Sequence, residues 1–162
     1  MDDHLTVRSA TSRDDAALLT LDAAAWDPGT GFPSVQERPR TSFFADAEPA
    51  GTLVAERDGR ILGYLSSAPP TALPENAHVA AISGLAVDPR HRGEGVGRQL
   101  LSECVRRARH RGATKVSLRV LATNEAAMRV YRAAGFEVEG VLAGEFVVDG
   151  EPVDDVLMAR SL

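Results

Sequence analysis

The chain has few of the residue types that would support a disulfide framework, a metal site or a membrane span. Its 162 residues include one cysteine, Cys104, which cannot form an internal disulfide, and neither CxxC nor HExxH spacing occurs. No stretch approaches the roughly 20 apolar residues of a membrane-spanning helix. The N-terminus carries acidic residues where a secretory signal carries basic residues and an apolar run. We therefore expect a cytoplasmic protein without a metal or a membrane partner.

The remaining composition is that of an ordinary globular protein, 44% hydrophobic and 25% charged, which predicts a single domain over residues 1–162. The net charge of −5 argues against general nucleic-acid binding, although residues 90–111 hold seven arginines against two glutamates. Because no aromatic residue lies among these arginines, a solvated helix face is favoured over a nucleic-acid surface. Residues 137–155 carry seven acidic residues and no basic one, which we interpret as exposed strand faces. We expect no nucleic-acid partner.

The order of the expected elements predicts an α+β fold around a mixed sheet. Asp-Gly pairs at 58–59 and 149–150 favour hairpin turns, because both residue types tolerate a positive φ. Along the chain we expect a strand at 4–10, a helix at 11–26, a proline-rich loop at 27–40, strands at 52–57 and 60–67, a buried strand at 78–89, a helix at 95–111, a strand at 115–123, a helix at 124–135, and strands from 136 to the C-terminus.

Glycines occupy every second position at the junction between the buried strand and the following helix. The motif Arg92-Gly93-Glu94-Gly95-Val96-Gly97 is not a Walker loop, which requires GxxxxGK followed by Ser or Thr. It is not a dinucleotide fingerprint either, because Arg98 stands where GxGxxG, counted from Gly93, requires its last glycine. The unpaired N–H groups and partial positive charge of a helix start favour a phosphate-sized anion. A glycine-rich turn without a ligand is the alternative.

Two segments carry a resemblance to a known family. "LAVDPRHRGEGVGRQLL" resembles the acyl-CoA-binding segment of the GNAT N-acetyltransferase superfamily, and "VLATNEAAMRVYRAAGFEVEG" resembles its second signature. Together they cover about residues 80–142, in the order and separation of that superfamily. The resemblance implies a mixed, mostly antiparallel sheet of about seven strands, flanked by about four helices. Its central parallel strands, here near 79–88 and 115–121, would splay apart around acetyl-CoA.

The resemblance also implies a role for individual residues. Leu85 and Val87 would present main-chain groups to pantetheine and the thioester, amides from Arg92 to Arg98 would hold the pyrophosphate, and Asn124 would contact the pantetheine arm. Tyr131 would stand beside the sulfur as the catalytic acid that protonates the departing thiolate. The implied donor-binding residues are Leu85, Ala86, Val87, Arg92, Gly93, Glu94, Gly95, Val96, Gly97, Arg98, Asn124, Ala127 and Tyr131.

The implied reaction is direct acetyl transfer from acetyl-CoA to a primary amine of a small molecule or of a protein or peptide. An alkyl ammonium has a pKa of about 10.4, so it must lose a proton before attack. Arg119 stands where several relatives with peptide substrates place a glutamate, so their base does not transfer to this chain. The sequence leaves five candidate bases open, namely Glu56, His78, Ser83, Glu145 and Asp155.

The acceptor side has weaker patterns. Trp26, Phe32, Phe43 and Phe44 could wall an acceptor pocket, and packing in the core is an equal alternative. Cys104 shares a helix face with Leu100 and Ala108, which indicates core packing rather than an acyl-carrying nucleophile. A coenzyme A-binding sensor without turnover is the competing functional hypothesis. The oligomeric state, a homodimer included, stays open.

Overall fold

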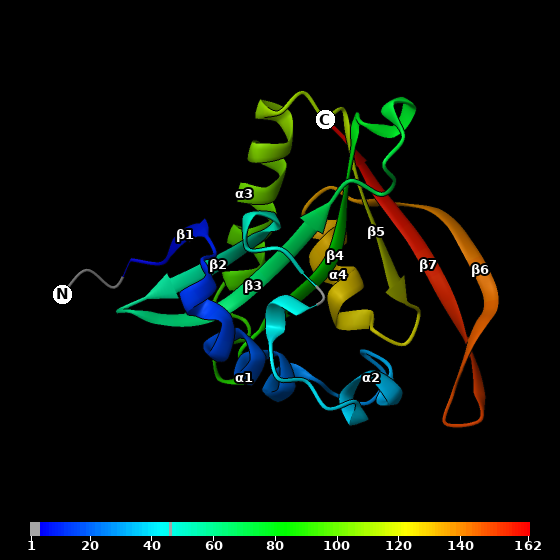
Figure 1. The fold of residues 1–162 in the computed structure, drawn as a ribbon. Coiled ribbons are helices and arrows are strands. Elements are labelled where there is room, and N and C mark those ends of the chain that lie inside the picture. Colours follow the sequence, from blue (N-terminus) through cyan, green and yellow to red (C-terminus); the bar gives the residue numbers. More distant parts are fainter. Residues whose placement is uncertain (1–3, 46) are drawn as a thin grey trace.

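A computed structural model of the chain describes residues 4–45 and 47–162 (Figure 1). Within these residues, seven strands form one sheet in the order β1-β2-β3-β4-β5-β7-β6. The strands are β1 (Thr6–Ser9), β2 (Thr52–Arg57), β3 (Arg60–Ala68), β4 (Val79–Val87), β5 (Lys115–Leu121), β6 (Glu137–Val148) and β7 (Glu151–Ser161). The α-helices are α1 (Asp15–Ala25), α2 (Pro33–Glu37), α3 (Val96–His110) and α4 (Glu125–Ala133).

This architecture confirms the predicted α+β fold. The pairing of β4 with β5 is parallel, whereas the other neighbouring strands of the described sheet pair antiparallel. Both Asp-Gly turns join antiparallel strands, and Asp58 and Gly59 have φ values of 50° and 73°, as the sequence predicts. None of the helices in the described part of the chain is long and apolar enough to cross a membrane.

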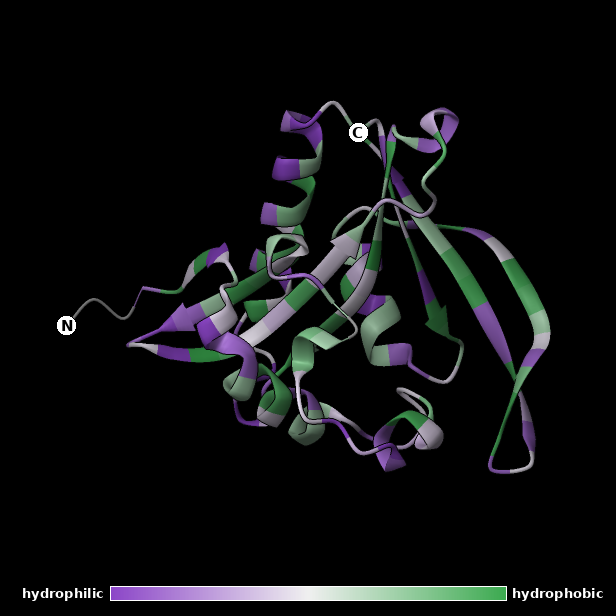
Figure 2. Cartoon of the chain, in the orientation of Figure 1, coloured by the Kyte–Doolittle hydropathy of each residue, from purple (hydrophilic) through white to green (hydrophobic). Residues whose placement is uncertain are grey.

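Helices cover both faces of the sheet, and alternation along the strands separates two apolar layers. On β2, Leu53 and Ala55 belong to the core shared with α3 and α4, whereas Val54 packs in the layer with α1. Figure 2 shows hydrophilic and hydrophobic bands alternating along α3, whose apolar side includes Leu100, Leu101 and Cys104. Cys104 is 4% exposed, so its predicted place in the core is confirmed.

A close contact at Gly63 sets the position of α3. A Cβ there would stand 2.9 Å from the Ala86 carbonyl oxygen and 3.0 Å from Val96 Cγ1, so glycine allows the first turn of α3 to pack directly on β3 and β4. The helix start therefore lies beside the carboxyl end of β4, where the glycine-rich loop leaves the sheet.

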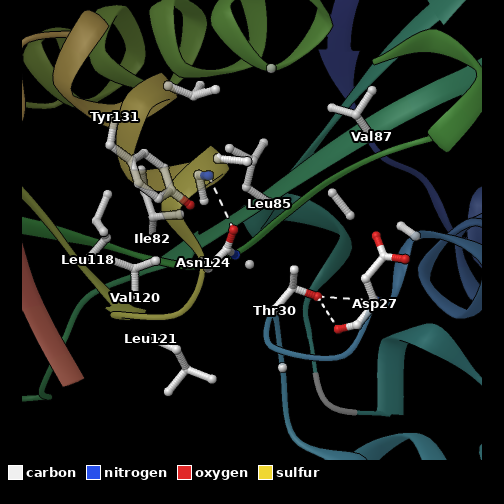
Figure 3. Close-up of a pocket in the computed structure, with 18 of the residues that line it drawn as sticks. Asp27, Thr30, Ile82, Leu85, Val87, Leu118, Val120, Leu121, Asn124 and Tyr131 are labelled. Atoms are coloured by element: carbon white, nitrogen blue, oxygen red, sulfur yellow. Dashed lines mark hydrogen bonds between the residues drawn. The ribbon is translucent and has the colours of Figure 1, made fainter. Parts of the chain in front are cut away.

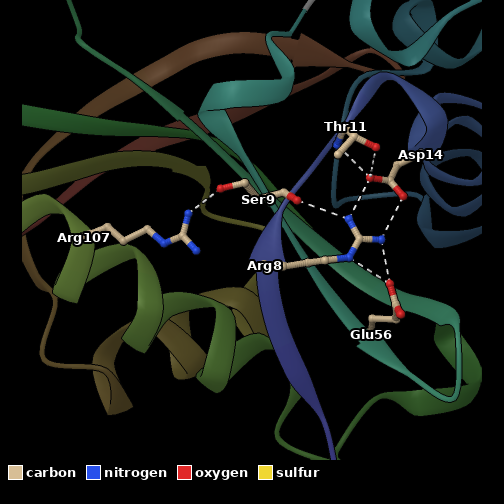
Figure 4. A network of polar contacts seen from close by, with 6 residues as sticks. All are labelled: Arg8, Ser9, Thr11, Asp14, Glu56 and Arg107. Carbon is tan, nitrogen blue, oxygen red and sulfur yellow. Dashed lines mark hydrogen bonds and ion pairs between the residues drawn. The ribbon is translucent and has the colours of Figure 1, made fainter.

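A polar network joins β1 to the start of α1 and to β2 (Figure 4). The Arg8 guanidinium donates to both carboxylate oxygens of Asp14 at 2.8 and 2.9 Å and to Glu56 Oε2 at 2.6 Å. Asp14 also accepts from the Thr11 amide at 2.7 Å, which completes a capping box. Because the Arg8 charge and these hydrogen bonds stabilise the carboxylate, the pKa of Asp14 falls to about 2. Arg8, Asp14 and Glu56 are not among the residues that line the cavity described below.

Candidate active site

The two parallel strands separate partway along their length. Pairing of β4 with β5 runs from Val79–Lys115 to Ile82–Leu118 and then stops, although both strands continue. Beyond this fork, β4 stays paired with β3 on its other edge, where the register shifts between Ser66 and Ser67. A cavity of about 1000 Å³ opens from the fork and is lined by both strands, α4, the glycine-rich loop and residues after α1. The splayed pair that the family resemblance implies is present.

The glycine-rich loop forms one end of the cavity. Gly93 and Gly95 have φ values of 80° and 83°, and Gly95 is the N-cap of α3. The first hydrogen bond of the helix joins the Gln99 amide to the Gly95 carbonyl at 3.0 Å, so the amides of residues 96–98 precede the helical ladder. A Cβ at Gly93 or Gly95 would meet no atom within 4 Å. The loop therefore offers N–H donors beside open space, which fits a phosphate-sized anion.

The charged side chains of this loop are placed differently from one another. The Arg92 guanidinium donates to Asp27 Oδ2 and to the Ala25 carbonyl, both at 2.8 Å, so its side chain is held by the end of α1. Glu94 accepts from Arg57 at 2.9 Å and lies 3.2 Å from His91 Nδ1. Arg98 lines the cavity. Of the two arginines among the implied donor-binding residues, Arg98 is thus the one whose side chain is not held by the end of α1.

Side chains from β4, β5 and α4 surround the middle of the cavity, and Figure 3 shows Leu85, Val87 and Leu118 turned into it. Asn124 Oδ1 accepts from the Ala127 amide at 3.2 Å, so Asn124 is the N-cap of α4. This contact uses the amide oxygen of Asn124 and leaves the side-chain NH₂ group to donate elsewhere. Ala86, Val96 and Ala127 also line the cavity, although Val96 is mainly a core residue at 1% exposure.

Tyr131 lies in the same part of the cavity. Its phenol oxygen is directed toward the space between Asn124 and Leu85 (Figure 3), and its ring packs against Phe136 with the centroids 5.9 Å apart. Burial raises the pKa of Tyr131 to about 12. The phenol therefore keeps its proton at neutral pH and can donate a hydrogen bond to a group in the cavity.

The four aromatic residues proposed for an acceptor pocket divide into two groups. Trp26 and Phe32 line the cavity. Phe43 is 3% exposed and packs in the layer beneath α1, where Phe44 is also partly buried. Phe43 and Phe44 therefore pack in the core.

The five candidate bases divide in the same way. Ser83 and Asp155 line the cavity, whereas Glu56, His78 and Glu145 do not. Glu56 belongs to the Arg8 network on the far edge of the sheet. Ser83 donates to the Ser66 carbonyl at 3.3 Å. Asp155 thus remains as the carboxylate of this set that reaches the cavity.

Asp22 and Tyr64 line the cavity and are absent from the sequence-based candidates. The Tyr64 hydroxyl donates to Asp22 Oδ1, and Arg40 Nη1 donates to Asp22 Oδ2, both at 2.5 Å. Burial, followed by the Asp22 charge, raises the pKa of Tyr64. The available signal was the position of Asp22 four residues after the buried Leu18, which puts a carboxylate on the packed face of a helix.

Arg119 and Asp155 form an ion pair at the fork of the splayed strands. Arg119 is the first residue of β5 beyond the last pair with β4, and Asp155 lies on the neighbouring β7. Arg119 Nε donates to Asp155 Oδ2 at 2.6 Å, and Nη2 contacts the same oxygen. The Asp155 side chain is 3% exposed and that of Arg119 is 56% exposed. The Asp155 carboxylate on β7 therefore lies directly beside Arg119 on β5.

Residues 26–37, here called the cover segment, lie along one side of the cavity. Asp27 at its start pairs with Arg92, and the Gly29 carbonyl accepts from Thr123 Oγ1 at 2.6 Å. Further along, the Phe32 and Phe146 rings pack edge to face, with their centroids 4.7 Å apart. The cover segment is thus joined to the glycine-rich loop, to the start of α4 and to β6.

Comparisons with known proteins agree with this geometry. A model of the acetyltransferase (GNAT) family matches residues 18–136. A mycothiol acetyltransferase of Thermobispora bispora is 32% identical over 127 residues, which are 76% of this chain and 43% of that relative. The chain therefore spans less than half the length of this relative. The L-amino acid N-acetyltransferase AaaT of Escherichia coli is 29% identical over 96% of this chain and 97% of its own.

Solved structures share the fold. The structure of yncA from Salmonella typhimurium, which holds acetyl-CoA, superposes with a TM-score of 0.79 at 23% identity, over 98% of this chain and 94% of the other. The family model covers well over half of the chain and includes both the fork of the sheet and the glycine-rich loop. The chain belongs to the GNAT family of acetyltransferases.

Proposed function

We propose that the protein is an N-acetyltransferase that moves an acetyl group from acetyl-CoA directly to a primary amine of a small molecule or of a protein or peptide. The observation that carries this proposal is the cavity at the fork of β4 and β5, which runs from the open amides of the glycine-rich loop to the phenol of Tyr131. A protein that bound only a phosphate would need the loop but not the apolar channel beyond it.

The residues along this channel match the successive parts of acetyl-CoA, from the pyrophosphate to the pantetheine arm. The amides of residues 96–98 and the Arg98 guanidinium would hold the pyrophosphate, because the space above Gly93 and Gly95 is open. Leu85, Ala86 and Val87 would line the pantetheine path, with the Asn124 NH₂ group as a donor to it. In support, yncA of Salmonella typhimurium holds acetyl-CoA in the same fold.

When bound, acetyl-CoA supplies the acetyl thioester that a neutral amine attacks as coenzyme A leaves. Tyr131, whose pKa burial raises further from neutral pH to about 12, would keep its proton in the resting site and donate it to the departing sulfur. Asp155 is our choice for the group that takes the ammonium proton, since it reaches the cavity. Transfer is direct, because Cys104 lies in the core, where burial raises the pKa of its thiol.

Further proposals concern the extent of the domain, its location in the cell and the class of acceptor. We propose that residues 1–162 form one acetyltransferase domain that works in the cytoplasm. AaaT acts on L-amino acids, which supports a small amine as the acceptor class.

Release of coenzyme A tests the proposal. The purified protein is incubated with acetyl-CoA and a panel of amino acids, aminoglycosides, polyamines and peptides, and free thiol is measured over time. We expect release that depends on at least one amine and a matching acetylated product. Binding of acetyl-CoA without turnover across the panel contradicts the proposal and supports the sensor hypothesis instead.

A further inference from the structure

The side of the cavity beneath the cover segment carries a guanidinium with one unused edge. Arg119 has five N–H donors, and its Nε and Nη2 both meet Asp155 Oδ2. Among the residues that the structure describes, none bonds to the other edge, which is formed by Nη1 and the second Nη2 hydrogen. That edge has the spacing of a carboxylate and belongs to a side chain that is 56% exposed. Arg119 can therefore hold a second carboxylate without releasing the first.

The position of Arg119 ties such a carboxylate to the reacting centre. Arg119 directly follows Leu118, the last residue of β5 that pairs with β4, so it stands at the fork where the two strands open. Arg119 and Tyr131 line the same cavity, so a group bound by Arg119 lies in the space into which Tyr131 projects. A carboxylate on the carbon that bears the attacking amine can bind Arg119 while the amine lies at the reacting centre.

The rest of this cavity side suits an ammonium group and an apolar side chain. Asp155 supplies a carboxylate whose two guanidinium contacts both use Oδ2, so Oδ1 keeps its lone pairs. Asp22 adds a second carboxylate, which already accepts from Tyr64 and Arg40. The apolar wall consists of Trp26, Phe32 and Val35 of the cover segment together with Phe146 of β6. Cationic, anionic and apolar surfaces thus meet in one place.

We propose that the acceptor is a free amino acid with an apolar or aromatic side chain, and that the outer edge of Arg119 binds its α-carboxylate. This inference rests on the proposed function and narrows it. The α-ammonium lies on the side of Asp155 and Asp22, and the side chain packs under the cover segment. Amines that lack the carboxylate, peptide N-termini included, lose the contact with Arg119.

Three acceptors that differ at one group test the inference. These are L-phenylalanine, L-phenylalaninamide and 2-phenylethylamine, which keep the ring and the amine and change only the carboxylate. For each, kcat/KM is measured with saturating acetyl-CoA, and binding to the protein loaded with coenzyme A is measured by calorimetry. We expect phenylalanine to exceed both others by at least about tenfold, the effect of one charge-assisted bidentate contact.

Variants of Arg119 separate recognition from folding. Arg119→Lys keeps a positive charge beside Asp155 but has no planar fork, so it retains the fold and brings the ratio of phenylalanine to phenylalaninamide close to one. Arg119→Gln also brings the ratio of phenylalanine to phenylalaninamide close to one. Arg60→Gln, an exposed strand arginine outside the cavity, is the matched control and leaves the ratio unchanged. A destabilised protein loses activity toward all three acceptors alike and does not change the ratio.

Two results overturn the inference. Turnover of the amide or of phenylethylamine equal to that of phenylalanine contradicts it while leaving the acetyltransferase proposal intact. A preference for phenylalanine that survives in Arg119→Lys and Arg119→Gln also contradicts it. If carboxylate-dependent binding is found without turnover of any amine, the proposed function fails and the assignment of Arg119 stands.

Discussion

Asn124 and Tyr131 lie seven residues apart on α4 and face the same cavity, one at the cap of the helix and the other two turns further along. The cap uses the Asn124 oxygen, which accepts from the Ala127 amide at 3.2 Å, and the Tyr131 hydroxyl is directed to the space beside it. One short helix therefore supplies a neutral N–H donor and a neutral O–H donor to the middle of the channel.

Replacing Tyr131 by phenylalanine removes the O–H donor and keeps the ring that packs on Phe136. We expect kcat to fall at least about tenfold, because a positioned general acid contributes that much or more. The dissociation constant for acetyl-CoA, measured by calorimetry, changes less than about threefold. Unchanged turnover in a folded Tyr131→Phe protein removes Tyr131 from the reaction.

Two substitutions at Asn124 separate its capping role from its contact with the donor. Asn124→Ala loses the cap and lowers the free energy of unfolding by about 1 kcal/mol. Asn124→Asp keeps an oxygen cap and loses the NH₂ donor. In urea unfolding, Asn124→Asp stays within about 0.5 kcal/mol of the parent, yet its acetyl-CoA affinity falls severalfold. Equal affinity in Asn124→Asp and the parent shows that the NH₂ group does not bind the donor.

The glycine-rich loop has a matched control within the chain. Gly95 and Gly150 both have a positive φ, and a Cβ on either would meet no atom within 4 Å. Alanine at either site therefore costs a similar amount of stability, about 1 kcal/mol, through backbone strain. We expect Gly95→Ala to weaken acetyl-CoA binding by about tenfold or more, because its Cβ enters the space above the loop. Gly150→Ala lies in the turn between β6 and β7, outside the cavity lining, and binds like the parent. If the two variants bind acetyl-CoA equally well, the pyrophosphate does not lie over Gly95.

Acid weakens the network around Arg8. The folded protein holds the pKa of Asp14 at about 2, below its ordinary value of 3.8, so the contribution of this carboxylate is complete above pH 3.8 and is lost as the pH falls toward 2. Asp14→Asn lowers the free energy of unfolding at pH 7 by about 1–2 kcal/mol. The difference from the parent shrinks as the pH falls below about 4 in urea titrations, whereas the exposed Glu75→Gln control stays parallel to the parent. A constant difference from pH 7 to pH 3 contradicts the assignment to Asp14.

Features encoded within a few neighbouring residues were predictable from the sequence. Gly95 at the helix start and the Asp58-Gly59 turn need residues that tolerate a positive φ, and the cap at Asn124 needs a short polar side chain. The structure has each of them there. The fork of β4 and β5 followed from the family resemblance, because a parallel pair that stops at Ile82–Leu118 leaves no local signature.

Features made by distant residues were not predictable. The Tyr64–Asp22 hydrogen bond joins residues 42 positions apart, and the Arg119–Asp155 pair depends on the register of β5 with β7. Arg92 belongs to the glycine-rich motif that is predicted to bind phosphate, yet its side chain binds Asp27, 65 residues earlier. The acceptor side is built from such contacts, which is why its patterns in the sequence are weak.

Amide hydrogen exchange with and without acetyl-CoA tests the central claim most directly, because it reports on the residues that would hold the donor. We predict slower exchange at the amides of residues 93–98 at the start of α3 and at Leu85 to Val87 when acetyl-CoA is added, with the Asp149-Gly150 turn between β6 and β7 unchanged. Unaltered exchange at residues 93–98 under saturating acetyl-CoA would contradict it.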